Sequence, residues 1–145
     1  MRSSFRIRLT NKHRMFTIPK LHALREDEEY DYLQVKHVVD WILANRGPTS
    51  FAEYDEELLT FAVVMGSEQG LFYIASEGQT IHGVCLLQKI EPFKVHVQEM
   101  LCKQPGLLKR FLTKIEELWP TIKYLTAYRD GKPIEYKIST LKRLL

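Results

Sequence analysis

The sequence contains little cysteine, glycine or proline and no long apolar run. Its 145 residues include two cysteines, seven glycines and six prolines. Two cysteines are too few for the disulfide framework of a small secreted domain, so we expect a reduced, cytoplasmic setting. The glycine content excludes a collagen-like chain. No apolar run approaches the roughly 20 residues of a membrane-spanning helix, and the N-terminus has no signal-peptide core, so we expect no membrane partner.

The composition is that of a globular domain with a substantial core. Apolar residues make up 45% of the chain and aromatic residues 11%. Chains of this length usually fold as one domain. We therefore predict a single domain over residues 1–145, in which residues 1–32 form a basic N-terminal strand and arm.

Charge is distributed unevenly along the chain. Residues 1–25 contain seven Lys or Arg and no acid, residues 26–87 contain two against twelve acids, and residues 88–145 contain twelve against six. The net charges of +7, −10 and +6 sum to +3. Two interpretations stay open: the basic ends bind the phosphates of a nucleotide cofactor or a nucleic acid, or the basic arm pairs with the acidic middle of the same fold.

The spacing of apolar residues predicts the secondary structure. Helical spacing indicates helices over residues 33–44, 55–66, 106–119 and 139–145. Short apolar or alternating runs predict strands over residues 5–9, 71–75, 81–87, 94–101, 122–128 and 134–138. Residues 10–32 have little period and are interpreted as arm or loop.

Two local features refine this outline. Asp55 is the predicted N-cap of the second helix, in which Leu58, Leu59, Ala62 and Met65 are expected to share the apolar face. The strand, helix and strand within residues 94–128 form a crossover that should place its two strands parallel. A mixed sheet with helices on its faces buries all these segments, so we predict an α/β or α+β fold.

The order of elements over residues 33–128 resembles the GNAT acetyltransferase superfamily. Two helices precede a hairpin whose second strand carries Gly83-Val84, and a central strand then leads through a loop into the main helix. The loop, Lys103-Gln104-Pro105-Gly106-Leu107-Leu108, is similar to the family motif Gln/Arg-x-x-Gly-x-Gly/Ala. Lys103 stands at the Gln/Arg position, Gly106 at the first glycine and Leu108 at the second small residue. The chain resembles a degenerate, virus- or phage-type member of this superfamily. The resemblance implies a mixed, mostly antiparallel sheet with a central parallel unit and helices on both faces.

The resemblance also implies a cofactor and a reaction. Acetyl-CoA would donate an acetyl group to an amine of a small molecule or a protein, and backbone N–H groups at the start of the main helix would hold its pyrophosphate. Glu99, on the central strand, is the candidate base, with Glu91 just before that strand, and Tyr136 or Tyr128 is the candidate acid. The implied cofactor-binding residues are Leu101, Cys102, Lys103, Gln104, Gly106, Leu107, Leu108 and Lys109, to which Arg110 adds charge.

The candidate catalytic residues also have purely structural explanations. Glu99 can simply pair with a neighbouring lysine, and Tyr128 and Tyr136 can be half-buried strand residues. The five histidines show no metal-ligand spacing, so no metal site is predicted. The alternative function is that of a non-catalytic GNAT-fold protein, phage-encoded or virion-associated, which binds a protein partner or nucleic acid through residues 1–25 and the basic, aromatic segment 128–132. The oligomeric state is not predicted.

Overall fold

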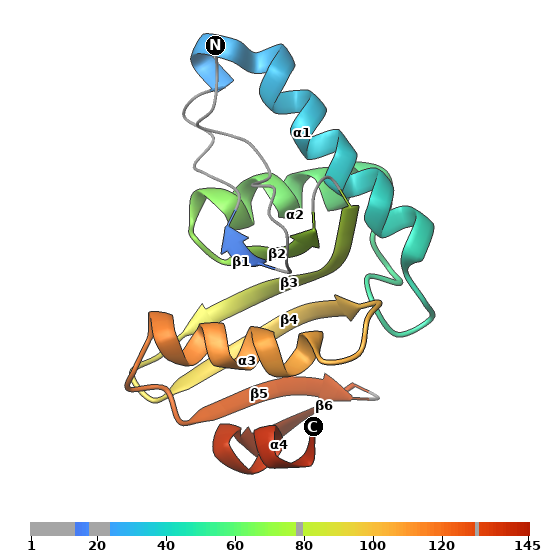
Figure 1. Cartoon of the computed structure of the whole chain (residues 1–145). Helices are drawn as coiled ribbons and strands as arrows, with labels where there is room; N and C mark the ends of the chain where they lie inside the picture. The colour runs from blue at the N-terminus through green and yellow to red at the C-terminus, as the bar shows by residue number, and fades with distance from the viewer. Residues whose placement is uncertain (1–13, 18–23, 78–79, 130) are drawn as a thin grey trace.

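The computed structural model describes residues 14–17, 24–77, 80–129 and 131–145 (Figure 1). The predicted strand 5–9 and most of the basic arm lie outside the described residues. The elements are β1 (Arg14–Thr17), α1 (Leu24–Asn45), α2 (Glu56–Glu68), β2 (Phe72–Glu77), β3 (Thr80–Ile90), β4 (Lys94–Cys102), α3 (Leu107–Leu118), β5 (Tyr124–Arg129), β6 (Lys132–Lys137) and α4 (Ile138–Leu144). Within the described ranges, no helix combines the length and the apolar character needed to cross a bilayer.

Two elements lie where the sequence predicted arm or loop. The first helix begins at Leu24 instead of residue 33. The prediction missed its first turns because residues 26–31 are mostly acidic and show no apolar period, although acidic residues stabilise the start of a helix. Strand β1 has only four residues, too few to show an alternating pattern, and it forms by pairing with β2. The local sequence pattern is therefore not enough to predict either segment, because each depends on contacts with other parts of the chain or on a weak local signal.

The described strands form one six-stranded sheet in the order β1-β2-β3-β4-β5-β6. Neighbouring strands are antiparallel except β4 and β5, which are parallel and are joined through α3. The predicted hairpin and crossover are thus confirmed. The protein has a mixed, mostly antiparallel α+β fold.

Two apolar cores lie on opposite faces of the sheet. In β2, Phe72 and Ile74 pack with α1 and α2, whereas Tyr73 and Ala75 pack with α3 and α4. This alternation is the two-residue period of a strand that is covered on both sides. Helices therefore cover both faces, as expected.

Helix α2 is rotated relative to the prediction. Asp55 caps it as expected and accepts a 2.7 Å hydrogen bond from the Leu58 N–H. The buried positions, however, are Leu59, Val63, Gly66 and Ser67, whereas Leu58 and Met65 are exposed. The helix approaches the sheet so closely at Gly66 that a Cβ atom there would lie 2.9 Å from Leu86 Cδ1. The expectation that Leu58 and Met65 belong to the core face was wrong, because α2 is apolar on several sides and tertiary packing selected one of them.

Candidate functional site

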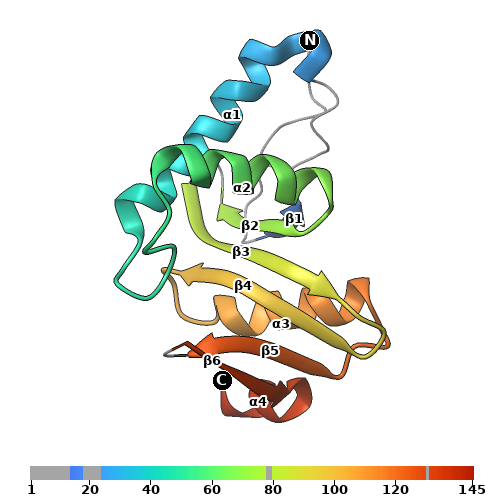
Figure 2. The same cartoon turned by 180° about the vertical axis from the view of Figure 1, so that it is seen from behind.

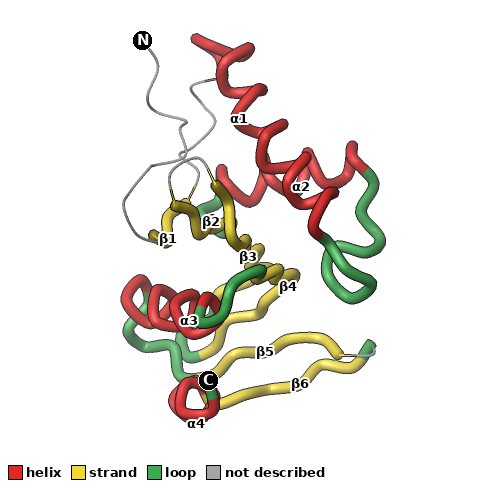
Figure 3. The backbone as a smooth tube through the Cα atoms, turned by 45° about the vertical axis from the view of Figure 1, so that its right-hand side comes forward, coloured by secondary structure: helices red, strands yellow, loops and turns green. Residues whose placement is uncertain are grey.

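Strands β4 and β5 are paired over only a short stretch. The register joins Lys94 to Tyr124, Val95 to Leu125 and His96 to Thr126, and β4 then continues to Cys102 without β5 as a partner. Figures 2 and 3 show the two strands side by side at one end and diverging toward the other. Since alternate backbone groups of a strand point to its two sides, part of the β4 backbone beyond His96 faces the side from which β5 has separated.

A β-bulge changes the direction of the side chains in β4. Leu87 pairs with Val97 and Leu86 with Glu99, so that Gln98 is an extra residue between them. Val97 lies in the core under α3, whereas Leu101 lies in the core under α1 and α2. Bulges re-aim side chains in this way. As a result, Glu99 points toward the side of the sheet that carries α1 and α2.

Glu99 is held at the loop between α1 and α2. Its Oε1 accepts a 2.9 Å hydrogen bond from the Phe51 N–H, and its other oxygen has no hydrogen-bond partner within the described residues. Burial raises the pKa of Glu99, the Phe51 N–H lowers it, and the negative charge of Glu53 raises it further, so that the net shift is upward. A carboxylate that is anchored through one oxygen and has a raised pKa is suited to accept a proton through the other.

The loop between α1 and α2 is fixed in an unusual conformation. Arg46 Nη1 donates hydrogen bonds to the carbonyls of Phe51, at 2.9 Å, and of Tyr54. The Ser50 hydroxyl donates to the Met100 carbonyl of β4 at 3.2 Å. Phe51 is fully buried with a φ of 56°, a left-handed conformation that is uncommon for a bulky residue. Such conformations persist where several contacts enforce them, often at functional sites.

Tyr54 adds a hydroxyl on the side of the sheet to which Glu99 points. Its oxygen accepts a hydrogen bond from Gln98 Nε2 at 3.4 Å. Burial raises the pKa of Tyr54, the hydrogen bond from Gln98 lowers it, and the charge of Glu99 raises it, with a net upward shift that keeps the hydroxyl protonated. Sequence reasoning missed Tyr54, because it lies between two helices far from Glu99 along the chain and no local motif marks it.

The start of α3 is open to solvent. Gly106 is the N-cap, with a φ of 86° and no side-chain cap, and a Cβ atom built on it would meet nothing within 4 Å. Leu107 anchors the helix in the core, and Leu108 is half-buried against the same core. Lys103 and Lys109 are exposed. The first-turn amides have no intrahelical acceptors, so this end of α3 favours an anion.

The four predicted cofactor residues that precede Gly106 have other contacts. The Lys103 N–H donates to the His82 carbonyl at 2.8 Å and extends the ladder of β3 and β4, so that this amide is not available to a ligand. Leu101 is buried in the core under α1 and α2. Burial raises the pKa of the Cys102 thiol to about 11, so Cys102 is protonated at neutral pH and is a poor nucleophile. Gln104 Nε2 lies 3.5 Å from the Nε2 of His82, a weak contact.

The two candidate tyrosines on the C-terminal strands lie apart from Glu99. Tyr136 pairs with Leu125 and is partly buried in the core under α3 and α4, on the face opposite to Glu99. Tyr128 pairs with Pro133 close to the turn between β5 and β6, and 64% of it is exposed. Tyr54, which packs against the core under α1 and α2, therefore lies on the side of the sheet to which Glu99 points, whereas Tyr136 does not.

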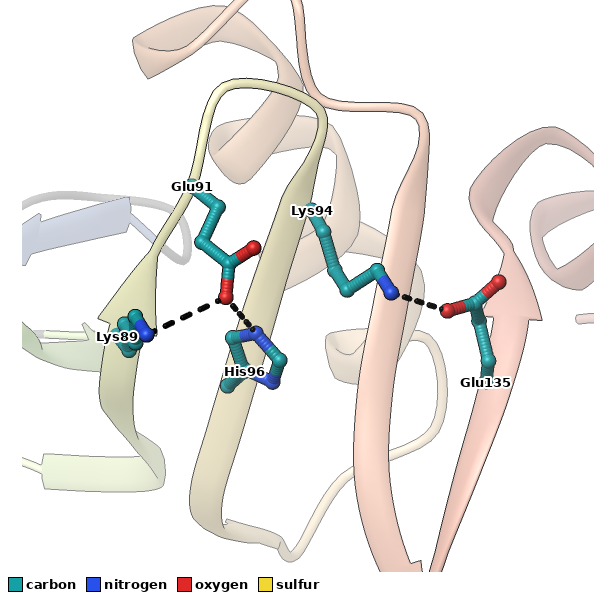
Figure 4. Close-up of polar contacts among 5 residues, drawn as sticks. All are labelled: Lys89, Glu91, Lys94, His96 and Glu135. Atoms are coloured by element: carbon teal, nitrogen blue, oxygen red, sulfur yellow. Dashed lines mark hydrogen bonds and ion pairs between the residues drawn. The ribbon is translucent and has the colours of Figure 1, made fainter.

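Glu91 belongs to a separate ionic cluster at the end where β4 and β5 are paired (Figure 4). Its Oε2 lies 2.7 Å from His96 Nε2 and 3.5 Å from Lys89 Nζ, and Lys94 Nζ lies 2.6 Å from Glu135 Oε1. The hydrogen bond with His96 is the main cause that lowers the pKa of Glu91. A carboxylate with a lowered pKa is a weak base, so Glu99 is the better candidate.

The pKa of Glu91 provides a test of this cluster. Replacing His96 by alanine is expected to raise the pKa of the Glu91 carboxyl toward its ordinary value, because the strongest hydrogen bond to the charged form is lost. A carbon-13 NMR titration of the side-chain carboxyls measures this pKa directly. The variant Lys89→Ala, which removes the longer contact, should produce a smaller rise. An unchanged Glu91 pKa in His96→Ala would contradict the assignment.

In the ranges that the structure describes, no group of three or more His, Cys, Asp or Glu residues is placed to hold a metal ion. Comparison with protein-family models and with curated proteins finds no match to the chain. The geometry of the β4, β5 and α3 region is therefore the basis on which a function can be inferred.

Proposed function

We propose that the chain is a GNAT-like N-acetyltransferase, which binds acetyl-CoA and transfers its acetyl group to a primary amine. The observation that carries this proposal is the separation of β5 from β4 beyond His96, followed directly by the open start of α3 at Gly106. An unpaired strand edge offers backbone groups to an extended ligand, and a helix N-terminus favours its phosphates. Glu99 belongs to the same strand, β4, and Tyr54 contacts Gln98 of that strand.

The residues at the start of α3 fit a phosphate-bearing cofactor. Gly106 has no side chain to cover the first-turn amides, and Leu108 is half-buried against the core. Lys103 and Lys109 add positive charge on either side, and neither forms an ion pair within the described part of the chain. We propose that the amides of Leu108 and Lys109 hold the pyrophosphate, while the Lys103 amide stays in the sheet ladder.

The proposed chemistry uses Glu99 and Tyr54. Acetyl-CoA, when bound, supplies an acetyl group activated as a thioester. The free oxygen of Glu99 takes a proton from the ammonium group of the substrate, and the resulting neutral nitrogen can bond to the acetyl carbon. Tyr54 donates its hydroxyl proton to the sulfur that leaves as the carbon–sulfur bond breaks. The nitrogen, now bonded to the acetyl carbon, loses its second proton to the Tyr54 oxygen, and Glu99 releases its proton to solvent, which restores both groups.

Binding of acetyl-CoA tests the proposal. Acetyl-CoA at a hundred times its dissociation constant should stabilise the fold by about 2.7 kcal/mol, and calorimetric titration should give the affinity. The double variant Lys103→Ala/Lys109→Ala is expected to bind about tenfold more weakly, because two cations near the phosphates are lost. Lys132→Ala, in the hairpin of β5 and β6, is the matched control and should bind normally. Absence of any stabilisation at millimolar acetyl-CoA would remove the transferase from consideration.

A non-catalytic binding protein is the second candidate, and the exposed Tyr128 favours it. Tyr128 lies near the tip of the hairpin of β5 and β6, one residue pair away from Lys132, and an exposed aromatic ring is suited to stack on a nucleic-acid base. Salt-dependent binding of a single-stranded oligonucleotide that is lost in Tyr128→Ala, together with no binding of acetyl-CoA, would select this function.

A further inference from the structure

The amide that holds Glu99 comes from a loop and not from a helix or a strand. The Phe51 N–H donates to Glu99 Oε1 at 2.9 Å, while the Phe51 ring is fully buried in the core under α1 and α2. Regular secondary structure therefore does not set the direction of this amide. The loop backbone around the buried ring decides whether the amide reaches Glu99.

The left-handed backbone of Phe51 lets its ring and its N–H point to different partners. The angle φ is the rotation about the N–Cα bond, so it sets the direction of the N–H relative to the side chain. At Phe51 φ is 56°, and a return to the usual range near −60° to −90° would rotate the N–H by more than about 100°. With the ring fixed in the core, that rotation would turn the amide away from Glu99.

Arg46 supplies contacts that enforce this backbone. Its Nη1 donates to the carbonyl of Phe51 at 2.9 Å and to the carbonyl of Tyr54, so that one guanidinium nitrogen binds both ends of the turn that follows the amide. Arg46 directly follows α1, and its own N–H donates to the Ile42 carbonyl at 2.9 Å, which fixes its backbone to the helix. Within the described residues Arg46 forms no ion pair, so its guanidinium is committed to the loop.

We propose that Arg46 is a positioning residue for the candidate base: it keeps the Phe51 N–H on one oxygen of Glu99 and leaves the other oxygen to take a proton. This role rests on the proposed acetyl transfer, which gives Glu99 its task as the base. The hydroxyl of Ser50 supports the same geometry, since it donates at 3.2 Å to the Met100 carbonyl of the strand that carries Glu99. A guanidinium suits the role because its N–H groups have fixed directions in one plane.

The Phe51 amide proton reports on this contact without any need for activity. In the native protein its NMR chemical shift should titrate with the Glu99 carboxyl, because a hydrogen bond to a carboxylate weakens when the carboxylate is protonated. In Arg46→Ala we expect this titration to be lost and the amide to exchange with solvent at least about tenfold faster. Glu53 and Tyr54 are the other titratable groups that interact with Glu99, and both are retained in the variant.

Kinetics connects the contact to the reaction. In Arg46→Ala, kcat for acetyl transfer should fall by about tenfold to a hundredfold, because the base is no longer held in place. The affinity for acetyl-CoA should stay at its native value, since Arg46 binds a loop on the α1 and α2 side of the sheet whereas α3 covers the opposite face. Arg46→Lys keeps the charge without the planar fork, and it should show a smaller loss of kcat and a smaller gain in amide exchange.

Two variants of α1 are the matched controls. Lys36→Ala removes a cation from the same helix, and Asn45→Ala removes the 2.8 Å hydrogen bond from Asn45 Nδ2 to the Trp41 carbonyl near the same helix end. Asn45→Ala thus loosens the end of α1 without touching the loop. Both controls should keep the native kcat and the titration of the Phe51 amide, which separates positioning from a general loss of stability.

The two readouts distinguish the possible failures. A native titration of the Phe51 amide in Arg46→Ala would overturn the proposal, and so would a native kcat in a protein that transfers acetyl groups. If the native protein transfers no acetyl group, the proposed function fails, while loss of the titration in Arg46→Ala still supports Arg46 as the residue that holds Glu99. Should Arg46→Ala not fold, native amide exchange and native kcat in Arg46→Lys would equally overturn the proposal.

Discussion

Glu99→Gln is expected to lower kcat for acetyl transfer by about a hundredfold to ten-thousandfold, the usual contribution of general-base catalysis. Glutamine keeps the shape of the side chain and can still accept the Phe51 N–H bond, but it cannot take a proton. The affinity for acetyl-CoA should stay unchanged, because Glu99 lies away from the phosphate end of the site. Steady-state kinetics with an amine acceptor, together with calorimetric titration, separates the two effects.

The pH dependence gives a second readout for Glu99. A base must be deprotonated to act, so kcat/KM of the native protein should rise with pH through a pKa above the ordinary value of a glutamate, since burial raises it. In Glu99→Gln this rise should disappear. Glu91→Gln is the matched control, and it should keep both the rate and the profile. A native pH profile in Glu99→Gln would show that another group is the base.

Phe51→Ala is expected to destabilise the fold by about 3–5 kcal/mol, the usual cost of truncating a buried phenylalanine. Phe51 is fully buried, and its ring packs edge-on against Tyr54 with the centroids 5.4 Å apart. Its N–H positions Glu99, so the loss also loosens the site. Urea unfolding monitored by circular dichroism measures the free energy of unfolding.

Phe93→Ala is the control for this change, because Phe93 is 59% exposed and its loss should cost no more than about 0.5 kcal/mol. Phe51→Leu should fall between the two, since it retains much of the buried volume. If Phe51→Ala proves no more costly than Phe93→Ala, the loop between α1 and α2 is not packed as the structure describes.

Helix α3 and the hairpin of β2 and β3 could be predicted because their signals are local. A broad apolar stripe that begins after Gly106, and two apolar runs around a tight turn, each indicate one type of element. The same local reasoning failed where the apolar period was weak, or where it was compatible with more than one buried side of a helix. The acidic start of α1 has no apolar period, and the several apolar sides of α2 left its rotation open.

The candidate site could be predicted only in part. Glu99 and the loop at Gly106 were candidates because the resemblance to the GNAT superfamily implies a carboxylate on the central strand and a phosphate-binding loop before the main helix. The contact between Glu99 and Phe51, the hydroxyl of Tyr54 and the placement of Tyr136 on the opposite face depend on pairing between distant segments. The one-residue bulge at Gln98 reverses the side to which Glu99 points, and the alternation of β4 alone does not reveal it.

Local spacing by itself determined most of the helices and strands, since these depend on neighbours within a few residues. The order of the elements then predicted the parallel crossover through the general rule for strand–helix–strand connections. Tertiary structure alone decided which side of α2 is exposed, where β5 leaves β4 and which groups surround Glu99. Those outcomes are set by close packing and strand register, which select among arrangements that the local pattern permits equally.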